Sequence, residues 1–226
     1  MAAEAQPVIE KLGIEKMPDI KGLPFRMYAG HAYGQQVVLM TSGVDPTTGV
    51  DNVGTVVAAV MAHTGIRKFG PDLVLNFGTA GGFKTCGAEI GSLYLCDRFR
   101  FHDRKIPFPG FLEYGIGDYV FTTPKELSGK FQTATATSGD SFSATGPERV
   151  EMLVLACRRL LVKDMEAAAI AKVCYWSEQP FLALKAVTDL VDGGGATQEE
   201  FVENLRFASE MLRDGVVSFL RAFGSR

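Results

Sequence analysis

The sequence has 226 residues, 46% hydrophobic and 22% charged, a balance typical of a globular domain large enough to bury a substantial core. Its formal net charge of -3 argues against a basic face that would neutralise a phosphate backbone, so nucleic acid is not an expected partner. No apolar run reaches the roughly 20 residues of a membrane span, and the N-terminus lacks a signal-peptide pattern. We therefore expect one cytoplasmic domain over residues 1–226, with no membrane partner.

The four cysteines and three histidines carry no recognisable metal-binding spacing. The cysteines are scattered without a C-x-x-C pair, and three histidines are too few to complete a zinc set. We expect free buried thiols in a reducing compartment and no metal site.

Strands and helices are predicted to alternate along the chain, which is the pattern of an α/β protein. The expected strands are apolar or β-rich runs bounded by Gly, Pro or Asp, at residues 35–41, 72–78, 92–97, 131–138 and 180–187. The expected helices have apolar residues every three or four positions, at residues 51–67, 146–158, 166–177 and 197–223. The last of them begins with the capping pair Thr197 and Glu200 and is amphipathic.

The segment 101–114 (FHDRKIPFPGFLEY) is too rich in Pro and aromatic residues for either a helix or a strand. It predicts a long ordered loop, and such loops usually cover a site or an interface.

Ligands of open α/β sheets bind at the carboxyl ends of strands, and the first distinctive end here is at 76–83 (NFGTAGGF), where the strand 72–78 is expected to run into a glycine-rich turn. The missing side chains leave room for a ligand to approach backbone amides. Such a turn is also ordinary turn chemistry, so this end alone is not specific. Its spacing is not that of a Walker loop, which argues against a nucleoside triphosphate.

Aromatic and acidic residues mark three other strand ends. Phe142 follows the strand 131–138, where it would either stack on a flat ring or belong to the core. Glu166 precedes an alanine-rich helix, where it would serve a ligand or the helix dipole. Asp189 closely follows the strand 180–187, and a buried carboxylate there predicts a raised pKa and a proton-donating role.

The four segments GTAGGF, SGDSF, DMEAAAIA and KAVTDLVDGG, in this order, are far more specific together than singly. The chain resembles the nucleoside phosphorylase/nucleosidase superfamily over nearly its whole length. VDNVGTV, FHDRKIP and the C-terminal EEF-x-x-N-L make it most similar to the plant-type 5′-methylthioadenosine/S-adenosylhomocysteine nucleosidases. The resemblance implies a three-layer α/β/α fold with a mixed twisted sheet, and a homodimer.

The resemblance also implies a hydrolase that releases adenine from 5′-methylthioadenosine, and S-adenosylhomocysteine is a further expected substrate, in methionine salvage. Cleaving an N-glycosidic bond requires an acid that protonates the leaving purine and a base that activates water. By resemblance, Asp189 is the acid and Glu4 is the base. Because protonation alone activates the leaving group, no metal and no organic cofactor is expected.

The other residues implied by the resemblance bind the substrate. Glu166 would accept hydrogen bonds from both ribose hydroxyls. The remaining expectations are Met165 beneath the sugar, Thr79 near the water, Ala80 and Gly81 with backbone amides at the substrate, Phe142 stacked on adenine, the backbone of Ser143 on the adenine edge, and Lys185 supporting Glu166 or the water.

Two alternatives stay open at this level. The first is a purine nucleoside phosphorylase, but phosphate is generally anchored by arginine, and Asn76 stands where phosphorylases of the superfamily carry one. The second is a binding or storage protein of the same fold. Retention of the three acids Glu4, Glu166 and Asp189 argues against it.

Two expectations concern the surroundings of the site. Relatives have an apolar strand before the segment that contains Glu4, and this chain begins at that segment, so a central strand is expected to be absent. The loop bearing Phe101, Ile106, Pro107 and Phe108 would either cover the 5′ substituent or fill a dimer interface. His102 in the same loop is expected to be structural.

Overall fold

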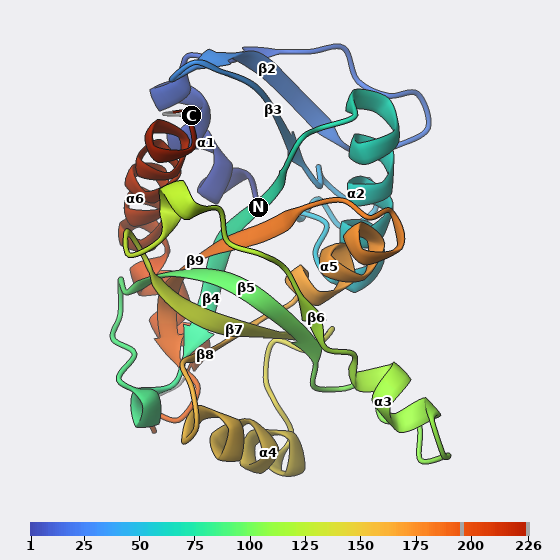
Figure 1. Cartoon of the computed structure of the whole chain (residues 1–226), viewed down its shortest axis with the longest axis vertical. Coiled ribbons are helices and arrows are strands. Elements are labelled where there is room, and N and C mark those ends of the chain that lie inside the picture. The colour runs from blue at the N-terminus through green and yellow to red at the C-terminus, as the bar shows by residue number, and fades with distance from the viewer. Residues whose placement is uncertain (195–196, 225–226) are drawn as a thin grey trace.

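The computed structural model describes residues 1–194 and 197–224, which fold into two sheets and surrounding helices (Figure 1). The helices are α1 (Ala2–Leu12), α2 (Thr55–Phe69), α3 (Phe111–Ile116), α4 (Gly146–Ala156), α5 (Ala167–Trp176) and α6 (Thr197–Phe223), with short 3-10 turns at Lys84–Cys86 and Lys125–Leu127. The strands are β1 (Glu15–Lys16), β2 (Arg26–Ala32), β3 (Gln35–Thr41), β4 (Val74–Gly82), β5 (Leu93–Phe101), β6 (Tyr119–Val120), β7 (Gln132–Ser138), β8 (Leu161–Asp164) and β9 (Phe181–Leu190).

The larger sheet is mixed and curls upon itself. Its strand order is β6-β5-β7-β8-β4-β9, and the first residues of β5 also pair with β9. β4 and β9, β5 and β7, and β7 and β8 are parallel, whereas β4 and β8 are antiparallel. The smaller sheet joins β1, β2 and β3 in antiparallel order. Figure 1 shows α1 and α6 on one side and α2 and α5 on the other, so the α/β class with a mixed sheet is confirmed.

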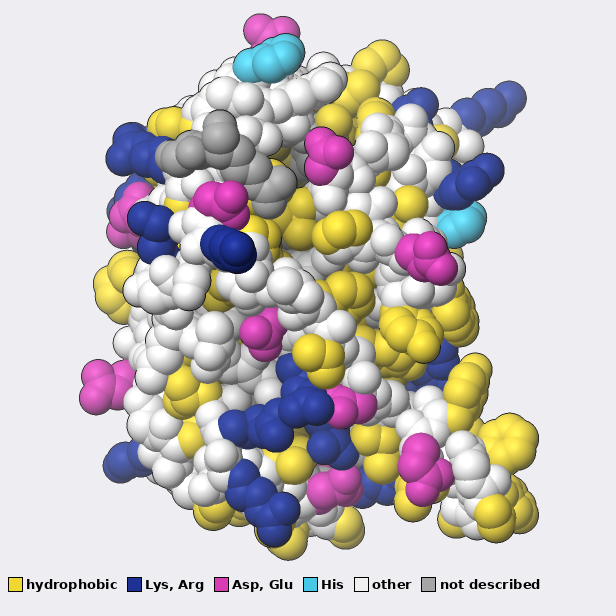
Figure 2. Space-filling model, in the orientation of Figure 1, with side chains coloured by type: hydrophobic (Ala, Val, Ile, Leu, Met, Phe, Trp, Pro, Cys, Tyr) yellow, Lys and Arg dark blue, Asp and Glu magenta, His cyan; other side chains and the backbone are white. Residues whose placement is uncertain are grey.

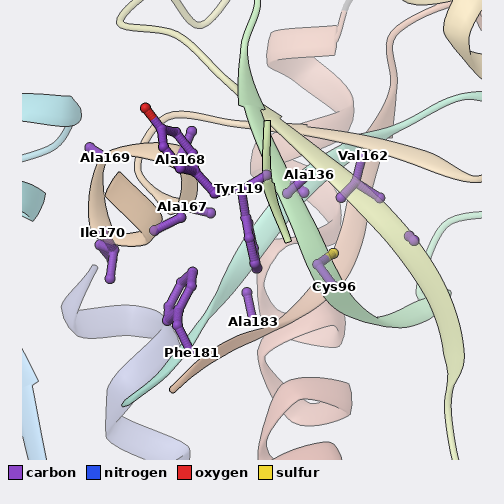
Figure 3. Close-up of a cluster of buried hydrophobic side chains, with 14 of the residues drawn as sticks. Cys96, Tyr119, Ala136, Val162, Ala167, Ala168, Ala169, Ile170, Phe181 and Ala183 are labelled. Carbon is purple, nitrogen blue, oxygen red and sulfur yellow. The ribbon is translucent and has the colours of Figure 1, made fainter. Parts of the chain in front are cut away.

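Small residues on α5 let this helix approach the sheet closely (Figure 3). Ala167, Ala168 and Ala171 are fully buried against the sheet. The ring of Phe99 on β5 lies 4.6 Å from that of Phe181 on β9, centroid to centroid. Because alanine side chains fill little space between helix and strand, the backbone of the first turn of α5 lies near the strand ends.

The predicted glycine-rich turn at 76–83 is wrong, because β4 continues through Gly82. A Cβ atom at Gly81 would lie 2.7 Å from a Val191 methyl and 3.0 Å from Asp189 Oδ2. One at Gly82 would lie 2.8 Å from the Ala88 Cβ. The glycines therefore allow close packing of neighbouring side chains against an extended strand, and they do not form a turn.

The predicted loop at 101–114 is shorter than expected. β5 extends to Phe101, whose ring is buried in the core, and α3 begins at Phe111. α1 and β2 have no counterpart among the predicted elements. The other predicted helices and strands are confirmed, α6 and β3 with the predicted bounds and the rest with shifted ends. For example, α2 begins at Thr55, after Gly54 with φ 99°.

Candidate active site

A cavity of about 990 Å³ opens at the carboxyl ends of β4 and β9 and continues between the two sheets. All residues of β3 and residues 74–81 of β4 line it, so the facing edges of these strands are open to the cavity.

All ten predicted site residues reach this cavity, although they come from five separate segments of the chain. They are Glu4, Thr79, Ala80, Gly81, Phe142, Ser143, Met165, Glu166, Lys185 and Asp189. The geometry thus brings the predicted group together, while the role of each residue stays a prediction.

Glu4 lies in the first turn of α1, and its carboxylate is buried against β4. The backbone N–H and the hydroxyl of Thr79 both donate to Glu4 Oε1 at 2.7 Å, and the Met1 ammonium donates to Oε2. Burial alone would raise the pKa of Glu4, but the ammonium and the two Thr79 hydrogen bonds lower it overall. An ionised carboxylate in this place is suited to accept a proton from water.

Asp189 lies near the end of β9, and its pKa is shifted in the opposite direction to that of Glu4. It is buried, and its Oδ1 accepts a hydrogen bond of 2.8 Å from the Thr188 hydroxyl. Burial raises the pKa of Asp189, although this hydrogen bond and the charge of Lys163 oppose the rise. A carboxyl group with a raised pKa is suited to donate a proton.

Glu166 is the N-cap residue of α5 and faces the N-terminus of α2. The backbone N–H of Gly54 donates to its Oε1 at 2.9 Å. Burial, with the negative charge of Asp164 nearby, raises the pKa of Glu166. One carboxylate oxygen accepts this bond, and Glu166 lines the cavity.

Lys185 forms an ion pair with Asp164, and its predicted support of Glu166 or the water stays a prediction. Lys185 Nζ lies 2.7 Å from Asp164 Oδ2, and both side chains are at most 2% exposed. Asp164 also accepts from the Ser138 hydroxyl and from the Ala167 N–H. Burial would raise the pKa of Asp164, but Lys185 and these hydrogen bonds keep it low. The pair ties the end of β8 to the middle of β9 beside the cavity.

Phe142 is 39% exposed, lies at the cavity, and packs edge-on against Phe201 of α6 at 5.5 Å between ring centroids. It is therefore not a core residue, and one of its faces is available to a flat ligand. Lys163 also lines the cavity, although no pattern in the sequence separated it from the acids that follow it.

The residues of the proposed lid lie elsewhere. Phe101 is in the core, and neither Ile106 nor Phe108 lines the cavity of this chain. His102 is buried outside the cavity, with Nδ1 3.3 Å from the Thr137 hydroxyl, as expected of a structural histidine.

The described residues contain no cluster of three or more His, Cys, Asp or Glu side chains placed to hold a metal ion. All four cysteines are free, and Cys157 is exposed where a buried thiol was expected. No helix in the described ranges is both long and apolar enough to cross a membrane.

Comparison with known proteins agrees with this geometry. A model of the phosphorylase superfamily matches residues 1–221. The chain belongs to the phosphorylase superfamily. This superfamily member is 39% identical to the 5′-methylthioadenosine nucleosidase of Arabidopsis thaliana over all of its own length and 85% of that protein. It is 37% identical to an Arabidopsis 5′-methylthioadenosine/S-adenosylhomocysteine nucleosidase, over 97% of its length and 87% of the relative's.

The likeness extends to three dimensions. The apo structure of Arabidopsis 5′-methylthioadenosine nucleosidase superposes on this superfamily member with a TM-score of 0.92 at 38% identity, covering 100% of this chain and 93% of the other. The resemblance deduced from the four sequence motifs is thereby confirmed.

Proposed function

We propose that this chain hydrolyses the N-glycosidic bond of 5′-methylthioadenosine to adenine and 5-methylthioribose, as a step of methionine salvage. The observation that carries the proposal is the pair of buried carboxyl groups in one cavity with opposite pKa displacements, raised at Asp189 and lowered at Glu4. Two carboxyl groups whose environments separate their pKa values are suited to act as acid and base in one reaction. The Arabidopsis relatives named as nucleosidases support the same reading.

In this mechanism each group acts on a different part of the substrate. Asp189 protonates the departing purine, so that the electron pair of the broken bond leaves on a neutral base. Glu4 takes a proton from the attacking water, and Thr79, which holds Glu4 Oε1, lies beside that water. Glu166 binds the ribose hydroxyls through its free oxygen, and Phe142 stacks on the purine.

S-adenosylhomocysteine is a second candidate substrate, because the relative that is 37% identical carries it in its name. We also propose a cytoplasmic homodimer. Figure 2 shows hydrophobic side chains gathered on the protruding segment around α3, where Phe108, Phe111 and Tyr114 are each more than half exposed. A second copy would cover this surface.

The deciding experiment is adenine release from 5′-methylthioadenosine by the purified chain, in phosphate-free buffer and again with phosphate added. We expect the same release in both buffers, with free methylthioribose as the second product. Release that requires phosphate would instead establish a phosphorylase, and nucleoside binding without release would indicate a binding protein. Repeating the assay with S-adenosylhomocysteine tests the second substrate.

Replacing Glu166 with Gln is expected to weaken ribose recognition. A hydrogen bond to a charged group contributes about 1.5–3 kcal/mol, so kcat/KM should fall on the order of 10- to 100-fold. The fall should be smaller for the 2′-deoxy analogue, which offers one hydroxyl fewer. The measurement is the ratio of kcat/KM for the two substrates, and Glu203→Gln, at an exposed position of α6 away from the cavity, is the matched control. An unchanged ratio would remove Glu166 from ribose binding.

A further inference from the structure

We propose that Lys163 is a positioning residue that holds the backbone of residues 141–143 at the cavity and thereby sets the affinity of the site for the purine ring. The inference rests on the proposed function, because that function places adenine against Phe142 and Ser143. It adds a residue from β8 to those that determine binding.

The contacts of Lys163 are unusual for a lysine. Its side chain is 6% exposed, and its Nζ donates to the carbonyl oxygens of Ser141 at 2.7 Å and Phe142 at 2.8 Å. Among the described residues, no carboxylate forms an ion pair with this ammonium, whereas Lys185 two strands away has Asp164 as its partner. A buried cation is costly unless hydrogen bonds compensate it, so the two carbonyls are what keep Lys163 in place.

The segment that Lys163 binds packs through the ring of Phe142 on Phe201, but its backbone has few hydrogen bonds. Residues 141–144 connect β7 to α4 and belong to no helix or strand. Before it, Asp140 is anchored by Thr55 and Asp103, and after it, Thr145 caps α4 with Glu148. Within the described part of the chain, the two bonds from Lys163 are the hydrogen bonds made to the backbone of 141–144. The lysine therefore fixes the stretch that carries Phe142.

Strand register places Lys163 in line with the acid of the site. Gly81 of β4 is paired with Lys163 of β8 on one side and with Asp189 of β9 on the other. Residues that are paired across a sheet point to the same face, and Gly81 has no side chain to stand between its neighbours. Lys163 and Asp189 thus lie on either side of Gly81 on the face of the sheet that lines the cavity. The 141–143 segment is held beside them by Lys163.

The ammonium is the part of Lys163 that matters, so a variant without donors tests the proposal. In Lys163→Met we expect adenine to bind on the order of 10- to 100-fold more weakly by calorimetry, because two charge-assisted hydrogen bonds that order the binding segment are lost. KM for 5′-methylthioadenosine should rise by a similar factor, while kcat falls less. Lys163→Arg, which retains donors of the same charge, should restore adenine binding to within a few-fold of the original.

Lys172→Met is the matched control. Lys172 is also 6% exposed, but it lies outside the cavity, against the rings of Tyr114 and Trp176. Its replacement should leave adenine affinity unchanged. If Lys163→Met folds with unchanged adenine affinity and KM, or weakens binding no more than Lys172→Met does, the proposal is overturned.

A further variant tests the proposal if Lys163→Met does not fold, and the unaltered chain separates this proposal from the proposed function. Should Lys163→Met fail to fold, Lys163→Gln keeps one donor and is expected to weaken adenine binding partially; unchanged affinity in Gln also overturns the proposal. A chain that binds adenine in a Lys163-dependent manner but releases none from nucleoside would uphold this inference while refuting the proposed function.

Discussion

The variant Asp189→Asn is expected to lower kcat for 5′-methylthioadenosine by about a thousandfold, within the range of 10²–10⁴ that general acid catalysis typically contributes. Asparagine has nearly the same volume as aspartate and still accepts a hydrogen bond from Thr188, but it has no proton to give to the purine. Nucleoside affinity should therefore stay within a few-fold. The measurements are single-turnover rates and the Kd of the variant for its unreacted substrate.

The pH dependence gives the same prediction an independent test. An acid must be protonated to act, so kcat/KM of the unaltered chain should fall as the pH rises through the pKa of Asp189, which burial has raised. Asp189→Asn should lack this alkaline limb. Asp192→Asn is the control, because Asp192 binds Lys84 and Thr85 outside the cavity. Retention of full activity by Asp189→Asn would exclude Asp189 as the acid.

Elements with a strong periodic pattern could be predicted from the sequence. α6 repeats its apolar positions over seven turns and has the predicted bounds, and β9 is mostly apolar because both of its faces are covered. The sequence pattern does not predict an element whose formation depends on tertiary contacts. β2 (RMYAGHA) has no clean alternation and is formed through its pairing with β3.

The site was predictable in membership but not in its internal pairing. Five of the ten residues lie in β4 or β9 and the others follow a strand or belong to the first turn of a helix, and the common direction of β4 and β9 gathers them at one end. The partner of Lys185 depends on the register of β8 relative to β9, with β4 between them. The local sequence does not determine that register. For the same reason the contacts of Lys163 with the carbonyl oxygens of residues 141 and 142 could not be predicted from the sequence.

The second large effect is expected at Glu4. Glu4→Gln should lower kcat on the order of a hundred- to a thousandfold, since a positioned general base contributes about 10²–10⁴. Glutamine keeps the size of the side chain and an oxygen that accepts from Thr79, but it cannot take a proton from water. Glu10→Gln, on an exposed turn of the same helix, should have no effect on kcat and controls for changes in α1.

The acidic side of the pH profile separates this role from a structural one. Because the pKa of Glu4 is lowered, the unaltered chain should retain activity below the usual pKa of a glutamate and lose it only as the pH falls through the lowered value. A residue that merely braced Thr79 would cost stability in Glu4→Gln without removing this acidic limb. If the variant keeps both its rate and its acidic limb, water is activated by another group, and Thr79 with its hydroxyl at the same oxygen becomes the next residue to replace.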